Sequence, residues 1–591
     1  MKAKVAYQST LFYTILFAGL FAYLQAACKW HFYFIEQNQV FQNTAAYVLE
    51  SIMKFGGLAD TIFGFFLQTY TIIYIGAAVT AALLTAAGAL MGATLGRVLV
   101  RCVATELLAV IPIVALLLIH FDFNYLYSGT VAIILTLAAT TLTFSVKNPT
   151  IRNCIHPAVM LLLAFIAGPA FALYGAMAVV FEGLAKKNLR AALVQLGITI
   201  GLGMGIIALN ISPEIRFTFL PDFYYHDSLR PKSVIYFSWI AIVLVLILAC
   251  FFAKRARPKS RLRRWTEFVA LAAILALMFF YGTSKYRNSR AEKIKELDYY
   301  CRTQQWTKIL EQSKGPLSNY LLLNYANLAL ANTGQLGDKM FAYRQHGPFG
   351  LISEWDKTAP VSVLHSDIFY ALNLTAAAQE KAFEAYISAI SGGNPRMLQR
   401  LVDTNLIYGA YPVASKYLDI LENTMMYKGW AKDRRKFINN DDAVEADSQL
   451  GPRRRALPKT ADLGFMKAFD AELVSLAESN PEDSVSITYA GLWNLLCKDV
   501  GSFKRLIESH AGTAGLRRLP VSFEEAIILI AENDPDYWQR FNISDRTIAR
   551  FMEFKKQVVA ANRSNSAYSL PQQLQTMFGD TYWYYFKFSK I

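Results

Sequence analysis

The sequence predicts an all-α protein with two parts: a polytopic α-helical membrane domain over residues 1–284, then a soluble, tetratricopeptide-like helical domain over residues 285–591. The chain of 591 residues has a mean hydropathy of +0.27, which is too apolar for an ordinary soluble protein. The apolar excess lies in the first half, in runs of about twenty residues, the length that a helix needs to cross a bilayer core. In the second half, apolar residues recur at helical spacing between Gly and Pro positions.

A basic stretch, Lys254–Arg264, sets the orientation. It contains seven Lys and Arg in eleven residues and separates two apolar runs, 234–253 and 265–281. Basic loops are retained on the cytoplasmic side of a membrane. The loops assigned to that side carry sixteen Lys and Arg, and those on the other side carry five. We therefore expect a cytoplasmic N-terminus and an extracytoplasmic C-terminal domain.

About seven full spans are expected, at residues 10–28, 65–93, 103–119, 129–146, 191–208, 234–253 and 265–281. A further apolar block near 156–184 is broken by Gly168-Pro169. As a single helix it would place Lys186 and Lys187 on the outer side, against the charge rule. Two half-length helices that turn at Gly168-Pro169 keep these lysines inside. Irregular backbone at membrane depth is tolerated where protein covers it, so this block predicts a re-entrant hairpin.

The clearest unit of the second half is Gly409–Leu418. Here a helix is expected to end near Gly409, Tyr411 to cap the turn, and the small Ala414 to let the next helix approach its partner. This arrangement is typical of a tetratricopeptide-like helix pair. Between such units, residues 432–459 are charged and punctuated by Pro, and they include Arg453-Arg454-Arg455. We expect a flexible surface loop there rather than a binding patch.

Composition excludes several classes of function. The net charge of +15 is explained by the orientation signals and by contact with anionic lipid, so no nucleic-acid partner is expected. The six cysteines show no paired spacing, and the sequence does not decide whether Cys301 and Cys497 form a disulfide. No phosphate loop, nucleophile elbow or metal-ligand motif is present. We therefore expect no metal and no organic cofactor.

Three polar segments are expected on the outer side of the membrane, at residues 34–40, 122–125 and 222–230. Carboxylates and a histidine could there deprotonate an acceptor, and the candidate catalytic residues are Glu36, Asp122, His226 and Asp227. Amide, hydroxyl and guanidinium groups could hold a substrate, and the candidates are Gln37, Gln39, Tyr125 and Arg230. The alternative is that these loops are polar because they face water, with tyrosines as interface anchors.

The chain resembles an uncharacterised family of multi-spanning membrane proteins from Bacteroidota, a domain of unknown function. The resemblance rests on scattered segments: Glu36-Gln37-Asn38-Gln39, 55–59, 299–306, 519–526, 543–544 and 578–586. It implies the inner membrane of a bacterium, with a periplasmic C-terminal domain. It implies no activity.

The membrane half also resembles polytopic glycosyltransferases of the GT-C class. Glu36 stands where their catalytic acid would stand, and the Gly168-Pro169 hairpin is similar in style. Those enzymes carry Asp, often as an acidic pair, whereas Gln37 follows Glu36 here. This departure puts a metal-assisted role in doubt, and the resemblance carries over Glu36 alone, as a base.

Two functions stay open. The first is a transferase that uses a polyprenyl-phosphate-linked donor at the periplasmic face, with Glu36 as the base. The second is a scaffold anchored in the lipid bilayer, whose helical array binds a periplasmic protein or peptide along its concave face. A transferase predicts a cavity lined by Glu36 and His226, and a scaffold predicts that these loops pack shut. A transporter is disfavoured, because the spans lack recurring intramembrane charges.

Overall fold

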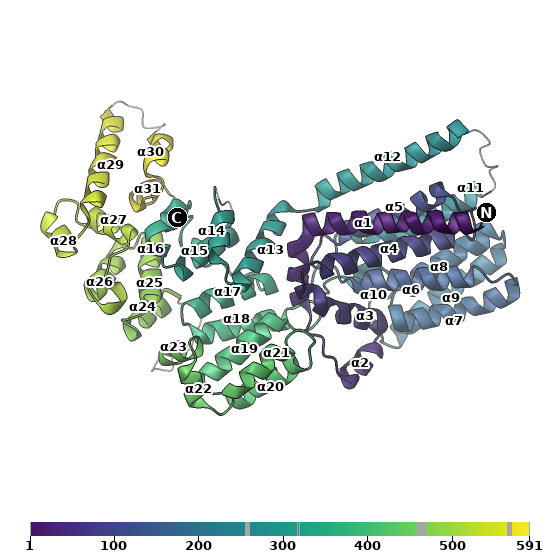
Figure 1. Ribbon diagram of the computed structural model, residues 1–591, viewed down its shortest axis with the longest axis horizontal. Helices are drawn as coiled ribbons and strands as arrows, with labels where there is room; N and C mark the ends of the chain where they lie inside the picture. Colours follow the sequence, from purple (N-terminus) through teal and green to yellow (C-terminus); the bar gives the residue numbers. More distant parts are fainter. Residues whose placement is uncertain are drawn as a thin grey trace. The chain divides into compact units, whose positions relative to one another are not determined.

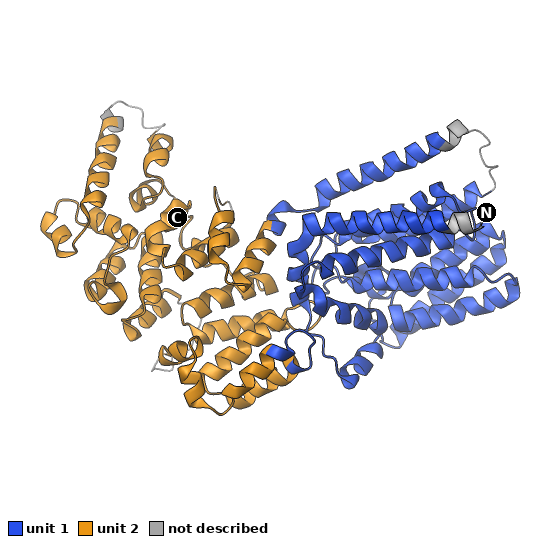
Figure 2. Cartoon of the chain, viewed as in Figure 1, with its two compact units in different colours: residues 1–292, 422–429 blue, residues 293–421, 430–591 orange. Residues whose placement is uncertain are grey.

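The computed structural model describes residues 2–253, 261–315, 317, 319–457, 469–563 and 570–589. Within them every regular element is a helix, and Tyr125 and Tyr225 form an isolated antiparallel bridge (Figure 1). The chain divides into two compact units (Figure 2). Unit 1 comprises Met1–Glu292 and Glu422–Gly429, and unit 2 comprises Lys293–Leu421 and Trp430–Ile591. Residues 254–260 of the basic stretch lie outside the described residues.

Unit 1 contains helices α1 (Lys2–Ile35), α2 (Ala45–Ile52), α3 (Gly57–Leu67), α4 (Ile75–Leu95), α5 (Val103–Ile119), α6 (Ser128–Thr143), α7 (Pro149–Ala167), α8 (Ala170–Val180), α9 (Leu189–Ala208), α10 (Ile215–Phe219), α11 (Val234–Phe252) and α12 (Arg261–Tyr286). Among the described residues, six helices are long and apolar enough to cross a membrane: α1, α4, α7, α9, α11 and α12. Shorter apolar helices are α5, α6 and the segment Ala170–Ala185. These helices suggest a membrane protein.

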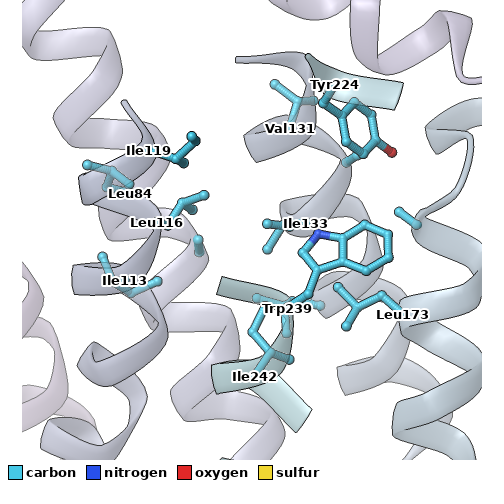
Figure 3. Packing of buried hydrophobic residues seen from close by; sticks show 14 of the residues in the cluster. Leu84, Ile113, Leu116, Ile119, Val131, Ile133, Leu173, Tyr224, Trp239 and Ile242 are labelled. Carbon is cyan, nitrogen blue, oxygen red and sulfur yellow. The ribbon is translucent and has the colours of Figure 1, made fainter. Parts of the chain in front are cut away.

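The core of unit 1 is close-packed around α4. Small residues allow this approach: a Cβ atom added at Gly76 would lie 2.6 Å from the Cβ atom of Phe32 on α1. Lipid tails are as apolar as these side chains, so helices in a membrane associate through such close contacts. Figure 3 shows another region of the core, where Trp239 of α11 lies beside Leu173 of α8 and Ile133 of α6.

The second predicted span begins later than expected. Residues 65–93 do not form one helix, because α3 ends at Leu67, a 3-10 turn η2 (Gln68–Thr71) follows, and α4 begins at Ile75. Tyr74 adopts a left-handed conformation (φ 69°) at this break. Polar groups stabilise the turn: the side-chain amide of Gln68 forms hydrogen bonds with the side-chain amide of Asn43. An average of hydropathy over the whole run does not detect single polar residues of this kind.

The block at 156–184 forms a hairpin that turns at Gly168 (φ 59°), but its arms are longer than the half-length helices predicted. Helix α7 begins at Pro149 and has 19 residues, enough to cross a membrane by itself. The tip meets two loops that the charge pattern places outside: Gly56 N donates to Phe165 O at 3.0 Å, and the Tyr224 hydroxyl donates to Ala167 O. The sequence pattern missed the first turns of α7 because polar residues near Arg152 resemble a loop.

A buried polar network joins the other end of this hairpin. Arg152 binds Glu182 through Nε to Oε1 at 2.5 Å and Nη2 to Oε2 at 3.1 Å. His156 lies 3.5 Å from Glu182 and contacts the Tyr174 hydroxyl at 2.9 Å. Glu182 sits in a π-helical turn, η3 (Phe181–Ala185). Because Arg152 and Glu182 are both almost fully buried, the pair fixes α7 against the end of α8.

We expect Arg152→Ala to lower the free energy of unfolding by about 3–5 kcal/mol, because it leaves the Glu182 charge buried without its guanidinium. The measurement is denaturant unfolding of the full chain in detergent. The double variant Arg152→Leu with Glu182→Leu should recover most of the loss, and an equal loss in both would contradict the interpretation. Lys54→Ala, which breaks the exposed Lys54–Glu50 pair, is the control and should cost less than about 0.5 kcal/mol.

Unit 2 contains α13 (Ser289–Arg302), which begins within unit 1, and then α14 (Trp306–Gln312), α15 (Tyr320–Asn332), α16 (Leu336–Lys339), α17 (Ala359–Ala371), α18 (Thr375–Ile387), α19 (Pro395–Ile407), α20 (Tyr411–Glu422), α21 (Lys428–Arg434), α22 (Asp441–Ala446), α23 (Leu450–Arg455), α24 (Phe469–Ser479), α25 (Ser484–Leu496), α26 (Val500–His510), α27 (Val521–Ile530), α28 (Pro535–Arg540), α29 (Asp545–Arg563), α30 (Leu570–Phe578) and α31 (Tyr582–Phe588). Helices α17, α18 and α19 pack in succession.

Two successive helices flank Gly409, as predicted. Helix α19 ends at Ile407, Gly409 adopts the left-handed conformation (φ 72°) common after a helix, and α20 begins at Tyr411. Ala414 is completely buried, as expected for a close helix approach. Residues 432–457, in contrast, do not form the flexible loop expected there. They fold into the end of α21 and the helices α22 and α23, because their arginines bind carboxylates and helix-end carbonyls.

The C-terminal helices bury a carboxyl group, that of Glu525. Glu525 of α27 is 2% exposed, and its Oε2 accepts a hydrogen bond from Tyr582 N at 2.6 Å. The Trp583 indole donates to Glu525 O at 2.7 Å. Burial raises the pKa of Glu525 to about 8, although the Tyr582 N–H opposes this effect. This raised pKa favours the protonated form of Glu525 at neutral pH in the folded chain.

This raised pKa predicts a pH dependence of stability. Between the ordinary pKa of 4.5 and about 8, the folded state holds a proton that the unfolded state releases. Stability should therefore fall as pH rises through this window, by up to about 1.4 kcal/mol per pH unit. Glu525→Gln should remove this slope in unfolding measurements across pH values from about 5 to about 8. Glu478→Gln, which removes an exposed carboxylate on α24, is the control, and an unchanged slope in Glu525→Gln would contradict the assignment.

Candidate functional site

The three polar segments singled out by the sequence meet at one end of unit 1. Asn38 Nδ2 donates to Phe123 O at 3.2 Å, which joins the first segment to the second. Leu126 N donates to Tyr224 O at 2.9 Å and His226 N to Asn124 O at 3.1 Å, which joins the second to the third. The structure therefore brings together segments that are far apart in the sequence.

Asp122 stabilises this junction. Its carboxylate is buried and accepts hydrogen bonds from the Tyr225 hydroxyl at 3.0 Å and from Asn124 N at 3.1 Å. Lys232 Nζ lies 2.7 Å from Asp122 Oδ2. Burial and the nearby Asp122 charge raise the pKa of Tyr225. The candidate Tyr125 is buried as well, with its hydroxyl 3.3 Å from that of Thr130.

Glu36 is also enclosed. It is 2% exposed and begins the 3-10 turn η1 (Glu36–Asn38). The Tyr427 hydroxyl, from the segment Glu422–Gly429 of unit 1, donates to Glu36 Oε1 at 2.6 Å. This segment is held by a hydrogen bond from Asn43 N to Asn423 O at 2.7 Å. Gln37 is buried and Gln39 is half-buried.

The other candidates lie at the surface. The side chain of Asp227 is 85% exposed and that of His226 is 21% exposed, with His226 Nδ1 3.3 Å from Asp227 Oδ1. Hydrogen bonds from Ser228 and the nearby His226 lower the pKa of Asp227 against the opposing effect of partial burial. Arg230 is exposed. The predicted catalytic set therefore divides into two buried carboxylates and a surface pair.

A second candidate site, in unit 2, was not predicted. It is a pocket of about 380 Å³, within the size range of small-ligand sites. Cationic side chains dominate its lining: Arg302, Arg396, Arg400, Arg434 and Arg453. Two carboxylates, three aromatic rings and four amides complete the polar and aromatic lining: Asp367, Asp403, Trp306, Tyr370, Trp430, Gln304, Asn332, Gln399 and Gln449. Helices α13, α14, α15, α17, α19, α21 and α23 supply most of these residues.

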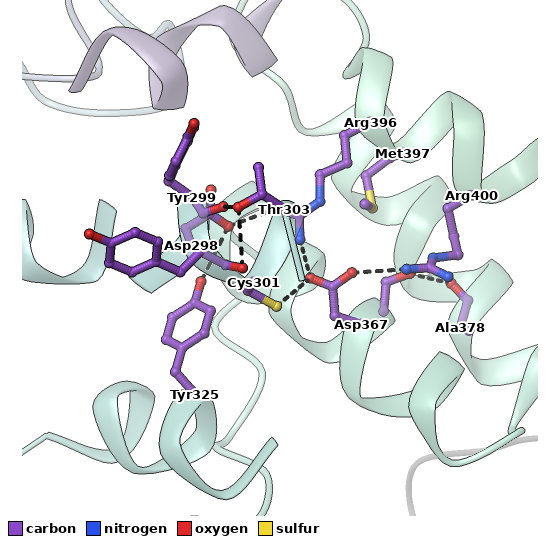
Figure 4. A network of polar contacts seen from close by, with 12 residues as sticks. Asp298, Tyr299, Cys301, Thr303, Tyr325, Asp367, Ala378, Arg396, Met397 and Arg400 are labelled. Carbon is purple, nitrogen blue, oxygen red and sulfur yellow. Dashed lines mark hydrogen bonds and ion pairs between the residues drawn. The ribbon is translucent and has the colours of Figure 1, made fainter. Parts of the chain in front are cut away.

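Arg396 forms the base of this pocket. It donates from Nη1 to Asp298 Oδ1 at 2.8 Å and from Nη2 to Asp367 Oδ2, so it links α19 to α13 and α17 (Figure 4). Asp367 Oδ1 also accepts from Arg400 Nη2 at 3.0 Å. Burial alone would lower the pKa of Arg396, but Asp367 and Asp298 raise it. Two arginines one helical turn apart thus clamp one carboxylate.

Above this base, Tyr370 lies between two cations. The guanidinium carbon of Arg400 is 3.5 Å from its ring centroid, and that of Arg453 is 4.0 Å away. Two guanidinium groups this close to the ring centroid would overlap if they lay on the same face of the Tyr370 ring. They therefore lie on opposite faces of the ring. Tyr370 is nine-tenths buried, and within the described residues its hydroxyl and Arg400 Nε have no hydrogen-bond partner.

Apart from its contact with the Tyr370 ring, Arg453 is held by backbone carbonyls. It donates to Tyr370 O at 3.2 Å and to Gln449 O at 2.8 Å, and it forms no ion pair with a carboxylate of the described residues. Burial lowers the pKa of Arg453, and the nearby Arg400 charge adds to this effect; Tyr370, Asp403 and Asp483 oppose it. Burial also raises the pKa of Asp403, although Arg434 and Arg400 oppose the rise. Within the described part of the chain, the pocket therefore contains a cation that has no carboxylate within ion-pair distance, although the charges of Asp403 and Asp483 act on it from further away.

Comparison with known proteins identifies the family. A model for a family of unknown function, DUF6057, matches residues 4–589. The chain belongs to this family. No curated protein and no solved structure matches it. The DUF6057 match covers nearly the whole chain and confirms the expected membership of an uncharacterised family.

In this DUF6057 chain one sequence feature points to the pocket, the run Arg453-Arg454-Arg455. The three side chains diverge. Arg453 enters the pocket, Arg454 binds Asp441 at 2.6 Å and Ile407 O at 3.0 Å, and Arg455 binds Glu445 at 2.9 Å. The other pocket residues are scattered from 301 to 449, so helix packing alone assembles them.

The described part of the DUF6057 chain contains neither a cluster of metal ligands nor a bond between Cys301 and Cys497. There, no group of three or more His, Cys, Asp or Glu side chains is placed to hold a metal ion. Cys301 and Cys497 are both free thiols. Cys301 is buried, and its Sγ lies 3.5 Å from Asp367 Oδ2 at the base of the pocket.

Proposed function

We propose that the protein is a non-enzymatic, membrane-anchored binding protein whose helical domain binds an extracytoplasmic protein or peptide. The observation that carries this proposal is the arginine-lined pocket of unit 2. It combines the size of a ligand site with a cation, Arg453, that has no carboxylate partner among the described residues. Buried polar groups are normally satisfied, so an unneutralised cation in a pocket favours an anionic ligand.

The proposed location is the inner membrane of a bacterium, with unit 2 in the periplasm. The six apolar helices support a membrane anchor. The excess of Lys and Arg in the loops assigned to the cytoplasm supports the orientation. The tetratricopeptide-like character of unit 2 is part of this proposal and is supported by the α19–α20 pair.

The closed loops of unit 1 also support the binding function. A transferase predicts an open cavity lined by Glu36 and His226. In the structure, Glu36 is enclosed and bonded to Tyr427, and Asp122 is neutralised by Lys232. This is the packing that a scaffold predicts.

The binding function predicts a partner at the pocket in living cells. A photoreactive amino acid at Gln449, which is exposed and lines the pocket, should give a discrete crosslinked adduct on illumination. The same probe at Lys504, exposed outside the lining, is the control. The adduct should disappear when Arg453→Gln is combined with the Gln449 probe. Absence of any adduct, or an adduct that Arg453→Gln leaves unchanged, would contradict the proposal.

The transferase is the second candidate. One observation favours it: the segments bearing Glu36, Asp122 and His226 converge at one end of unit 1, next to the hairpin tip. In this mechanism Glu36 is the base and a polyprenyl-phosphate-linked sugar is the donor. Because Tyr427 covers Glu36, the segment Glu422–Gly429 would have to move before an acceptor could reach it.

Glu36→Gln separates the two candidates. The substitution preserves size and removes the carboxylate base, so a transferase should lose at least about a hundredfold in activity. The measurement is the envelope glycan profile of a deletion strain that carries wild-type or Glu36→Gln protein at equal abundance. A profile that the deletion does not alter, or full rescue by Glu36→Gln, would exclude the transferase.

A further inference from the structure

We propose that the arginine-lined pocket of unit 2 binds a carboxylate of an acidic peptide, held by Arg453 and Arg400 beside Tyr370. This inference rests on the binding function proposed above and names the chemistry that the pocket recognises. Arg453, Arg400 and Tyr370 all belong to unit 2.

The pocket already binds one carboxylate, that of Asp367. Arg396 and Arg400 lie four residues apart on α19, and their guanidinium groups contact its two oxygens. The guanidinium fork matches the two oxygens of a carboxylate. Arg400 uses Nη2 for Asp367, which leaves its Nε without a partner among the described residues. For a second carboxylate, Arg400 therefore offers Nε as a single donor, and Arg453 offers the other guanidinium.

The charge balance of the pocket favours an anionic ligand, because five arginines line it and Asp367 and Asp403 are the carboxylates of that lining. Three of the arginines have carboxylate partners: Arg396 pairs with Asp298 and Asp367, Arg400 with Asp367, and Arg434 with Asp403 at 3.4 Å. Arg453 donates only to backbone carbonyls among the described residues. A carboxylate can therefore pair with Arg453, and its two oxygens match the planar guanidinium fork.

The wall around these cations fits a peptide. Trp306 and Trp430 offer apolar faces, and the exposed amides of Gln304 and Gln449 can donate to and accept from peptide groups. The Tyr370 hydroxyl, which has no partner within the described residues, can donate to the ligand. A peptide supplies a carboxylate, backbone amides and apolar side-chain surface together.

The test is isothermal titration of the full chain in detergent with the tripeptide Gly-Ser-Glu. Its free form should bind, and the form with Gln in place of Glu and an amidated C-terminus should not. The two singly neutralised forms show whether the side chain or the C-terminus supplies the carboxylate, and one of them should retain binding. Binding by the fully neutral peptide, or tighter binding of inorganic pyrophosphate than of Gly-Ser-Glu, would overturn the proposal.

Variants locate the site. Arg453→Gln should weaken Gly-Ser-Glu binding about 10- to 100-fold, the usual loss for a charge-assisted hydrogen bond. Tyr370→Phe should weaken it about fivefold. Arg455→Gln, two residues away on α23 and outside the lining, is the matched control and should leave the affinity unchanged. Unchanged affinity in both Arg453→Gln and Tyr370→Phe, with unfolding curves like that of the wild type, would exclude this pocket.

The two proposals fail in different ways. If an Arg453-dependent adduct forms in cells but neutral and acidic peptides bind alike, the binding function is supported and the carboxylate inference is wrong. If acidic peptides bind but no adduct forms in cells, the pocket is a carboxylate site and the partner-binding function is wrong.

Discussion

Arg396 is the residue on which the organisation of unit 2 depends. A buried guanidinium must have its donors satisfied, and here Asp298 and Asp367 satisfy them from two helices, α13 and α17. Because Asp367 also binds Arg400, the same carboxylate orients the second arginine and, through it, the Tyr370 ring. The shape and charge of the pocket therefore depend on one neutralised cation at its base.

Unit 1 also neutralises buried charge by pairing, but in more apolar surroundings. Its helices pack through small residues such as Gly76, and its charged groups form short networks near the helix ends. Arg152 with Glu182 fixes one end of the α7–α8 hairpin, and Asp122 with Lys232 fixes the loops near its tip. A charged group in apolar surroundings is stable when an opposite charge pairs with it. Because the two members of each pair come from different segments, each network also holds those segments together.

Hydropathy and charge predicted the helical class and most of the apolar helices, because those depend on local composition. These predictions were wrong where a helix contains polar residues and where polar residues form a turn within an apolar run. Arg152 belongs to α7 although its surroundings resemble a loop, and Gln68 lies in a turn within a run that resembles a span. The candidate residues of the three polar segments could be proposed from the sequence because each segment is local in the chain. The pocket was missed because Tyr370, Arg400 and Arg453 become neighbours only through helix packing.

The π-helical turn at Phe181–Ala185 makes the hairpin sensitive to chain length. Such a turn accommodates one more residue than an α-helix does over the same rise. Deleting a single residue from α8, upstream of this turn, would instead rotate Glu182 by about 100° about the helix axis and move its carboxylate away from Arg152. Substitutions around Glu182 would then be tolerated more readily than insertions or deletions. Any chain that keeps the Arg152–Glu182 pair would need to keep the number of residues between them.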